Sequence, residues 1–261
     1  MSVDLIELGE IAVAALDAVV PRLQEVHHED VGADTKSSAT DLVTEFDRWS
    51  ESTMVDLITA ARPGAGFIGE EGTTRTSTTG VVWLLDPIDG TTNFVYDLCG
   101  SSVSVAATLD GERAVGAVHD LVRDERFFAR RDAGATRDGT PIRVSGATVL
   151  STSLIATGFS YEADRRRAQA TALVEVLPAV RDIRRFGGAA ADLCSLACGR
   201  VDAYYERGLG AWDYAAGALI ASEAGAILDD RNADGGAFIG ATPAIADELF
   251  ALLDRAGVHE A

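Results

Sequence analysis

The segment from Trp83 to Asn93 constrains the fold of this chain more than any other. Its letters are WLLDPIDGTTN, so two acids, Asp86 and Asp89, come at the end of an apolar run and are followed by Gly-Thr-Thr. The run from Val81 to Leu85 predicts a buried strand. The Asp-Pro pair that follows predicts the end of this strand, because proline has no N–H for a sheet ladder. Both acids are therefore expected where the strand ends.

The residue types of this segment suit a hard cation beside an anion. Carboxylates such as Asp86 and Asp89 are ligands that Mg²⁺ prefers. The N–H groups of Gly90, Thr91 and Thr92 would point at an anion if these residues begin a helix. A cation next to such a turn predicts a phosphate site at the end of the strand.

The charge of the chain limits its ligands. The 41 acidic against 22 basic residues give a net charge of −19, so the positive surface typical of nucleic-acid binding is absent and we expect no nucleic-acid partner. A phosphorylated substrate would also be repelled unless a divalent cation, held by some of the acids, reverses the local sign. At 261 residues, without repeats or linkers, we expect a single domain over residues 1–261.

The N-terminal residues lack the basic and apolar pattern of a signal peptide, and no stretch approaches the roughly 18 apolar residues of a membrane helix. We therefore expect a cytoplasmic protein without membrane contact. Cys194 and Cys198 lie four positions apart in the helix-like run 189–198, and the third cysteine, Cys99, leaves the total odd. This pattern favours small core residues over a disulfide or a zinc site.

Apolar spacing predicts a layered α/β fold. Helices are expected over 3–27 (closing at or soon after Pro21), from Thr44 to the breaker at 62–64, and over 163–180, 189–199, 213–224 and 243–256. Strands are expected over 66–69, 81–85, 102–109, 113–118, 135–144 with a turn at 138–139, 153–157, 201–205 and 227–228. The Thr-rich segment 72–80 predicts a mobile loop. Alternating strands and helices in the second half favour α/β layers.

Four segments place acids at the ends of predicted elements. These acids are Asp41 and Asp47, Glu70 and Glu71, Asp86 and Asp89, and Asp213. Any one of them, taken alone, is more often a solvated loop residue. Glu70, Asp86, Asp89 and Asp213 each follow an apolar or aromatic approach, as carboxylates at the mouth of a sheet do, and four such acids suffice for two Mg²⁺ ions.

Taken together, six blocks of the sequence resemble the inositol monophosphatase family of lithium-sensitive, Mg²⁺-dependent phosphatases. They are Lys36-Ser37-Ser38 with Asp41 to Asp47, Phe67 to Glu71, Trp83 to Phe94, Gly187 to Asp192, Asp202 to Glu206, and Trp212-Asp213. The resemblance implies an α-β-α-β-α sandwich of the inositol monophosphatase and fructose-1,6-bisphosphatase type. It also implies Mg²⁺ as the cofactor and a homodimer.

The resemblance implies metal ligands. Glu70, Asp86 and the backbone carbonyl of Ile88 would hold a first Mg²⁺, and Asp86, Asp89 and Asp213 would hold a second. A third, weaker ion would involve Glu70 and waters.

The same resemblance implies catalytic and phosphate-binding groups. Thr91, hydrogen-bonded to Asp47, would help to hold the attacking water together with Glu70. The N–H groups of Gly90, Thr91 and, in the same turn, Thr92 would bind the phosphate.

Substrate contacts are also implied by the resemblance. They fall on Asp89, Gly187, Gly188, Ala189, Glu206 and Asp213. A carboxylate at Glu206 suits the vicinal hydroxyls of a cyclitol or sugar, while Gly188 departs from the small hydroxyl residue or alanine of many relatives and weakens one contact. Lys36 matches a lysine near the metals.

Several other stretches match known sequence motifs but lack the context that these motifs require. The GxGxxG match at Gly64–Gly69 follows a helix and precedes two acids, so no dinucleotide site is expected. The segment from Asp230 imitates an EF-hand loop, but its twelfth position is Ala241. Asp86 and Asp89 are three apart, not two as in phosphatases that form an aspartyl-phosphate, which favours direct attack by water.

For the histidines and for one arginine cluster we expect no catalytic or metal-binding role. The histidines lack metal-ligand spacing and are expected at the surface or at helix ends; they are His27, His28, His119 and His259. The cluster Arg165-Arg166-Arg167 predicts an exposed helix face or a dimer edge, which a phosphorylated substrate could pass.

Three functions follow as hypotheses. The first is hydrolysis of inositol monophosphate to inositol and phosphate by direct attack of a metal-activated water. The second keeps this chemistry on another ester: fructose 1,6-bisphosphate, histidinol phosphate or an adenosine 3′-phosphate. The third is an assembly factor that keeps the fold and acts through a protein or ribonucleoprotein partner.

Overall fold

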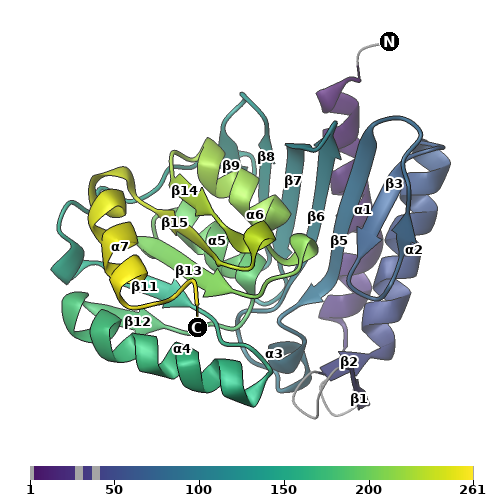
Figure 1. Cartoon of the computed structure of the whole chain (residues 1–261). Helices are drawn as coiled ribbons and strands as arrows, with labels where there is room; N and C mark the ends of the chain where they lie inside the picture. The colour runs from purple at the N-terminus through teal and green to yellow at the C-terminus, as the bar shows by residue number, and fades with distance from the viewer. Residues whose placement is uncertain (1–2, 27–31, 37–41, 261) are drawn as a thin grey trace.

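Five layers, in the order helix, sheet, helix, sheet, helix, make up the molecule (Figure 1). The structure is a computed structural model that describes residues 3–26, 32–36 and 42–260. Asp41, His27 and His28 lie outside the described residues, as do Ser37 and Ser38. The predicted α-β-α-β-α sandwich is thus confirmed.

The helices occupy the outer layers and the middle layer. Their bounds are α1 (Leu5–Gln24), α2 (Glu45–Ala61), α3 (Thr91–Val95), α4 (Ala163–Val176), α5 (Ala189–Ala197), α6 (Ala211–Glu223) and α7 (Pro243–Arg255). Short 3₁₀ turns cover Leu150–Thr152, Leu177–Ala179 and Asn232–Asp234.

The larger sheet follows the order β10-β9-β8-β7-β6-β5-β3-β4. Its strands are β3 (Gly66–Gly69), β4 (Thr74–Arg75), β5 (Val81–Asp89), β6 (Ser102–Leu109), β7 (Glu112–Asp120), β8 (Glu125–Arg130), β9 (Ala135–Arg137) and β10 (Thr140–Pro141). Only β3 and β5 pair in parallel in this sheet as described. Helices α1 and α2 cover one face, where Leu16, Met54 and Trp83 are fully buried in a shared core.

The smaller sheet follows the order β12-β11-β13-β15-β14. Its strands are β11 (Leu154–Thr157), β12 (Asp182–Arg184), β13 (Ala203–Arg207), β14 (Ile227–Asp230) and β15 (Ala237–Ala241). Helices α5 and α6 pack between the two sheets, and α4 and α7 close the outer face (Figure 1). A separate two-stranded ladder joins β1 (Ala33–Thr35) to β2 (Leu42–Thr44) just before α2.

Most predicted elements are confirmed. The first helix runs past Pro21 to Gln24, and α2 ends at the Arg62-Pro63-Gly64 breaker, as expected. The hairpin between β6 and β7 turns at Asp110-Gly111, where both residues have positive φ (54° and 89°), the geometry of a two-residue type I′ turn.

The predicted end of the central strand at Pro87 is wrong. Strand β5 continues to Asp89, because its ladder with β6 shifts register between Asp86 and Asp89, which pair with Ser104 and Ser102. Pro87 falls in this bulge, where its missing N–H costs no ladder bond. The bulge re-aims the two acids relative to the regular alternation of the strand.

The segment 72–80 is not loop throughout. Thr74 and Arg75 form β4 on the edge of the sheet, with the Arg75 guanidinium over the Phe67 ring and bonded to Thr59 Oγ1 at 2.8 Å. Besides β4, five strands were not expected from the sequence, namely β1, β2, β8, β12 and β15. In the part of the chain that the structure describes, no helix is long and apolar enough to cross a membrane.

Candidate active site

A pocket of about 470 Å³ opens between the two sheets, where the ends of β5 and β13 meet the first turns of α5 and α6. Four acids that the sequence singles out, Glu70, Asp86, Asp89 and Asp213, lie on its wall together with Glu206. They come from segments far apart in the chain. The four acids that the sequence singles out therefore line one pocket.

Asp86 is the least satisfied of these acids. Its residue is 1% exposed, and Oδ1 has no hydrogen-bond partner among the described residues. Burial, followed by the nearby charges of Glu70, Asp89 and Asp213, raises the pKa of Asp86 well above its ordinary value. A buried carboxylate without a partner is costly, so this oxygen is available to a proton or a cation.

Asp89, in contrast, is surrounded by donors. Its Oδ1 accepts from the N–H of Ala189 at 2.9 Å, and its Oδ2 accepts from Ser102 Oγ and from the N–H groups of Ala190 and Ala191 at 3.0, 2.9 and 3.3 Å. Asp89 thereby caps the start of α5 from another element. Burial outweighs these bonds and raises its pKa to about 7. Lone-pair capacity remains chiefly on Oδ1.

Asp213 and Glu70 complete the acidic wall. Asp213 is the third residue of α6, and its Oδ2 accepts from the N–H of Gly210 at 2.6 Å. Burial and the charges of Glu70 and Asp89 raise the pKa of Asp213 well above its ordinary value. Glu70 follows β3 and forms an ion pair with Lys36 at 2.9 Å.

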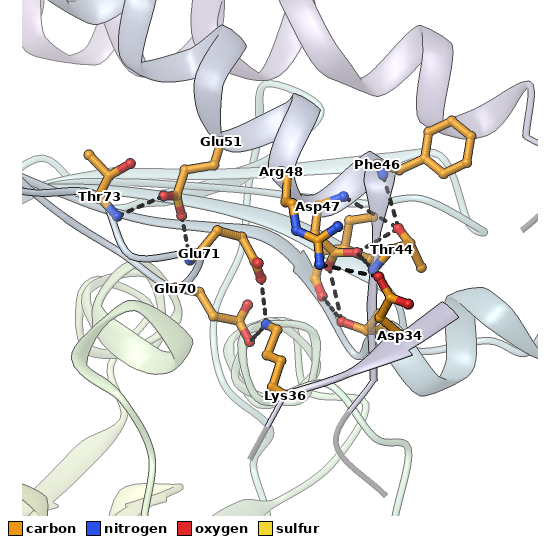
Figure 2. Close-up of polar contacts among 12 residues, drawn as sticks. Asp34, Lys36, Thr44, Phe46, Asp47, Arg48, Glu51, Glu70, Glu71 and Thr73 are labelled. Carbon is orange, nitrogen blue, oxygen red and sulfur yellow. Dashed lines mark hydrogen bonds and ion pairs between the residues drawn. The ribbon is translucent and has the colours of Figure 1, made fainter. Parts of the chain in front are cut away.

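Lys36 bridges two acids, since its ammonium also contacts Glu71 (Figure 2). Burial alone would lower the pKa of Lys36, but the charges of Glu70 and Glu71 raise it above its ordinary value. The pairing places one fixed positive charge at the acidic wall.

Asp47 and Thr91 form a buried pair beside this wall. Thr91 Oγ1 lies 3.2 Å from Asp47 Oδ1 and 3.0 Å from the carbonyl of Ile88. The other carboxylate oxygen of Asp47 accepts from the N–H and the hydroxyl of Thr44, which begins α2 with a capping box (Figure 2). Burial raises the pKa of Asp47. The expected Asp47–Thr91 contact is present.

The turn after β5 has the form expected of an anion-binding turn. Thr91 and Thr92 open α3, so their N–H groups have no acceptor within the helix. Gly90 has φ 80°, and a Cβ there would lie 2.4 Å from the carbonyl of Gly100. Only glycine fits this position.

Several of the expected substrate-side residues also lie on the pocket wall. Glu206 on β13 accepts from the Tyr204 hydroxyl at 2.8 Å, and burial raises its pKa. A Cβ at Gly158 would lie 1.9 Å from a Glu206 oxygen, so glycine makes the room for this carboxylate. Gly187 and Ala189 also line the pocket.

Gly188 packs against Asp89 and is not among the residues that line the pocket. A Cβ there would come within 2.7 Å of Asp89 Oδ2 and 2.6 Å of the Gly100 carbonyl. Close packing against Asp89 and the Gly100 carbonyl therefore explains why this position is a glycine.

Three polar residues at the site were missed by the sequence analysis. Glu51 on α2 is 2% exposed and accepts from the N–H groups of Glu71 and Thr73 at 2.8 and 3.0 Å, which holds the turn that carries Glu70 (Figure 2). Its spacing was a usable signal, since Glu51 lies four residues after Asp47 on the buried face of α2.

Asn93 and Asp192 are the other two. The Asn93 amide donates to the carbonyls of Cys99, Gly100 and Phe186 at 2.8, 3.3 and 2.5 Å, so it ties the turn after β5 to the segment before α5. Asp192 is 2% exposed with an unpartnered Oδ1 in the described structure, and burial raises its pKa well above its ordinary value. Neither has a spacing signal that identifies it.

The expectations for the cysteines are confirmed, whereas those for the histidines are only partly so. Cys99, Cys194 and Cys198 are all free, and Cys194 is buried in the core between the sheets. The surface expectation for His119 is wrong, because this residue lies inside the sheet on β7, 5% exposed, with Nε2 3.1 Å from Asp124. His259 is partly buried near the end of the chain, with Nε2 3.2 Å from Asp254.

The acids face one pocket without forming a closed cage. Among the described residues no three His, Cys, Asp or Glu side chains are close enough together to enclose a metal ion. The donor set nevertheless fits a hard cation, because it is all oxygen and includes the orphaned Oδ1 of Asp86.

Comparisons with known proteins agree with this geometry. A family described as the inositol monophosphatase family matches residues 4–256. The inositol-1-monophosphatase SuhB of Mycobacterium tuberculosis is 45% identical over 233 residues, which cover 84% of this chain and 80% of that protein.

A further sequence relative and a solved structure are also similar to this chain. The Nus factor SuhB of Pasteurella multocida is 38% identical over 222 residues, covering 82% of this chain and 83% of that protein. The crystal structure of the extragenic suppressor protein suhB from Bartonella henselae superimposes with a TM-score of 0.85 at 31% identity, covering 96% of this chain and 98% of that one.

Proposed function

This chain belongs to the inositol monophosphatase family, and on that premise we propose that it is a Mg²⁺-dependent phosphomonoesterase that hydrolyses inositol monophosphate to inositol and phosphate. The observation that carries the proposal is the unpartnered Oδ1 of Asp86, buried at a pocket that Glu70 and Asp213 share. Folding alone has no use for such a group. A divalent cation would compensate it and make the acidic pocket receptive to a phosphate ester.

Glu70, Asp86, Asp213, the Ile88 carbonyl and Oδ1 of Asp89 would hold the metal. When bound, the metal supplies positive charge that neutralises the phosphate and makes a nearby water more acidic. The pKa values of Asp86 and Asp213 lie well above their ordinary range in the protein alone, so metal binding would release protons from them.

The residues of the chain orient the reactants. Thr91 Oγ1 donates to Asp47 or to the Ile88 carbonyl, so its lone pairs stay free to accept a hydrogen bond from the attacking water. Glu70 would take one proton from this water as its oxygen bonds to phosphorus. The ester bond would break at the same time, and the leaving oxygen would take up a proton from a solvent water to give the alcohol. Because water attacks directly, no residue becomes phosphorylated.

Phosphate and polyol would lie on opposite sides of the pocket. The N–H groups of Gly90, Thr91 and Thr92 would hold the phosphate, while Glu206 accepts from two neighbouring hydroxyls of the ring. The Tyr204 hydroxyl, at 2.8 Å, fixes the Glu206 carboxylate for this contact.

A panel of phosphate esters, assayed for phosphate release with Mg²⁺ and with EDTA, tests the proposal. We expect turnover of inositol 1-phosphate with Mg²⁺ only, and a loss of about 10³-fold or more in Asp213→Asn. Asp56→Asn, an exposed acid on α2 away from the pocket, is the matched control and should keep full activity. Full activity of Asp213→Asn, or of the wild type in EDTA, would refute the site.

A variant at Glu206 distinguishes inositol monophosphate from the other candidate substrates. Glu206→Gln should raise KM for inositol 1-phosphate about tenfold, because one acceptor oxygen becomes a donor, while p-nitrophenyl phosphate, which has no ring hydroxyls, should be little affected. An unchanged ranking of substrates would favour another ester, such as fructose 1,6-bisphosphate, histidinol phosphate or an adenosine 3′-phosphate.

The similarity to a Nus factor supports a second candidate, an assembly role beside or instead of hydrolysis. With a net charge of −19, such a role would use a protein or ribonucleoprotein surface rather than bare nucleic acid. Capture of the same partner proteins by wild type and by Asp213→Asn would support this role, and capture of none by either would exclude it. Sedimentation of the purified chain tests the expected homodimer.

A further inference from the structure

One polar residue interrupts the buried face of α4. The helix buries Gln169, Ala172 and Val176, which share one face because they lie three and four positions apart. Ala172 and Val176 belong to an apolar core, whereas Gln169 carries an amide that is only 9% exposed. A buried amide needs hydrogen-bond partners, so packing in the core alone does not account for a glutamine at this position.

The partner of Gln169 is the segment 158–162, which follows β11. The amide oxygen of Gln169 accepts from the N–H of Ser160 at 2.9 Å. Arg166, three residues earlier on α4, donates from Nε to the carbonyl of Ser160, also at 2.9 Å. Within the segment, Ser160 Oγ accepts from the N–H of Glu162 at 3.1 Å. Two side chains of α4 thus bind both backbone polar groups of Ser160.

The segment that α4 holds in this way is a wall of the active-site pocket. All its residues, from Gly158 to Glu162, line the pocket. At its start, a Cβ at Gly158 would lie 1.9 Å from an oxygen of Glu206, the residue proposed to accept hydroxyls of the polyol. The segment therefore adjoins the polyol side of the pocket.

A small cavity of about 10 Å³ lies behind this wall. Gln169 lines the cavity, together with Gly158, Phe159 and Glu206. The last three residues also line the active-site pocket, so they form the partition between the pocket and the cavity. Gln169 lies on the far side of this partition and is bonded to the residue that continues it, Ser160.

We propose that Gln169 is a positioning residue: through Ser160 it fixes the segment 158–162 against Glu206 and thereby sets the shape of the polyol side of the pocket. This inference rests on the proposed phosphatase function and names a residue that determines how tightly the substrate binds. Loss of the acceptor leaves the Ser160 N–H without its partner and releases the segment, so the polyol meets a less well placed Glu206. The acids proposed to hold the metal belong to other segments and keep their positions.

Gln169→Met removes the acceptor and nearly keeps the volume of the side chain. It should raise KM for inositol 1-phosphate about five- to tenfold and change kcat less than about twofold. KM for p-nitrophenyl phosphate, which has no ring hydroxyls, should change less than about twofold. Gln169→Glu keeps an acceptor oxygen and should restore KM. Hydrogen exchange of the Ser160 amide, followed by NMR, should be faster in Gln169→Met and close to the wild-type rate in Gln169→Glu.

Arg166 provides a second variant that does not disturb the core. Its side chain is exposed, so Arg166→Met removes the other bond to Ser160 in a folded protein and should raise KM for inositol 1-phosphate about two- to threefold. Arg167→Met removes the same charge from α4 and is the matched control. Gln24→Met, which removes an amide bonded to Asp124 at 3.0 Å, is the control for Gln169→Met. Both controls should keep the wild-type KM.

An unchanged KM in Gln169→Met, an equal rise in KM for both esters, or a Ser160 amide that exchanges at the wild-type rate without the acceptor would overturn the proposal. So would a folded Gln169→Glu variant that keeps the raised KM. Absence of Mg²⁺-dependent turnover of any ester would instead overturn the phosphatase function, and the exchange rates would still test the contact with Ser160. Thermal unfolding of each variant shows whether it is folded.

Discussion

Asp86 and Asp89 lie three residues apart on one strand, and both are buried, yet their surroundings are opposite. Asp89 accepts hydrogen bonds from Ser102 and from three consecutive N–H groups at the start of α5, whereas Asp86 has an oxygen with no partner among the described residues. The bulge at Pro87 creates this difference, because it breaks the register between them. One strand end thus holds a structural carboxylate and an uncompensated one.

This contrast teaches how to separate a fold-building acid from a ligand-binding one. A buried carboxylate that donors surround contributes to stability, while a buried carboxylate without donors costs stability until a ligand compensates it. By this criterion Glu51 is a structural acid like Asp89, since it accepts hydrogen bonds from two N–H groups. Asp213 accepts a hydrogen bond from one N–H group and is intermediate between Asp89 and Asp86.

The largest effect is expected on activity when the uncompensated acid, Asp86, is replaced. Asp86→Asn should lower kcat by about 10³-fold or more, because a metal ligand is lost. Without metal its Tm should be equal to or above that of the wild type, since a buried, like-charged group is removed. Calorimetry in EDTA, together with phosphate release in Mg²⁺, checks both; a clear drop in Tm would place Asp86 among the structural acids.

Asp89 should behave in the reverse manner in stability. Asp89→Ala leaves the first N–H groups of α5 and the Ser102 hydroxyl without an acceptor, and we expect it to lower the free energy of unfolding by about 2–4 kcal/mol. Urea unfolding in EDTA measures this loss. Ser50→Ala, a buried residue with one long bond of 3.4 Å to Pro87, is the control and should lose less. Equal losses in the two variants would contradict the capping role.

The next effect concerns Asn93, which joins the phosphate turn to the wall before α5. Asn93→Ala should raise KM and lower kcat, each by about three- to tenfold, because the Gly90 and Gly187 segments lose their shared donor. Asn93→Asp should be worse, since it turns a carboxylate toward three carbonyls. Steady-state kinetics distinguishes the variants, and wild-type values in Asn93→Ala would show that backbone packing alone positions the turn.

The last expected effect is the dependence of stability on pH. An unfolded Asp has a pKa near 3.9, whereas Asp89 has about 7 in the folded protein and Asp86 and Asp213 lie well above their ordinary range. Between these values the folded state keeps protons that the unfolded state releases, so the free energy of unfolding falls as the pH rises from about 4 to 7.

Mg²⁺ and the variant Asp86→Asn should each change this pH dependence of stability. Mg²⁺ should flatten the decline, because a cation replaces the protons, and Asp86→Asn should flatten it in EDTA. Tm measured across this range in EDTA and in Mg²⁺ provides the comparison. The same slope in wild type and Asp86→Asn would mean that Asp86 ionises normally in the folded chain.

The sequence predicted the layers and the acids because both depend on local patterns. Helical spacing located α1 and α2, and an apolar run located β5. It could not predict that β5 passes through Pro87, because the bulge depends on pairing with β6. Nor could it predict which acids are capped, because the donors of Asp89 lie about 100 residues away on α5.

The arginines of α4 show the same limit. Three adjacent arginines look alike in sequence, yet Arg165 faces the pocket and Arg167 pairs with Asp164. Which arginine lines the pocket depends on how α4 sits in the folded chain, and this information is absent from the local sequence. Strand β15 was missed for a similar reason, because its short run Ala237–Ala241 contains a glycine and follows a turn-rich segment.

The central claim is that the uncompensated oxygen of Asp86 belongs to a divalent cation. An anomalous difference map from crystals grown with Mn²⁺ tests it most directly. We expect a peak within coordination distance, about 2.2 Å, of Asp86 Oδ1, with oxygens of Glu70 or Asp213 around the same ion. Ordered crystals with Mn²⁺ in the solution and no peak between these carboxylates would contradict it.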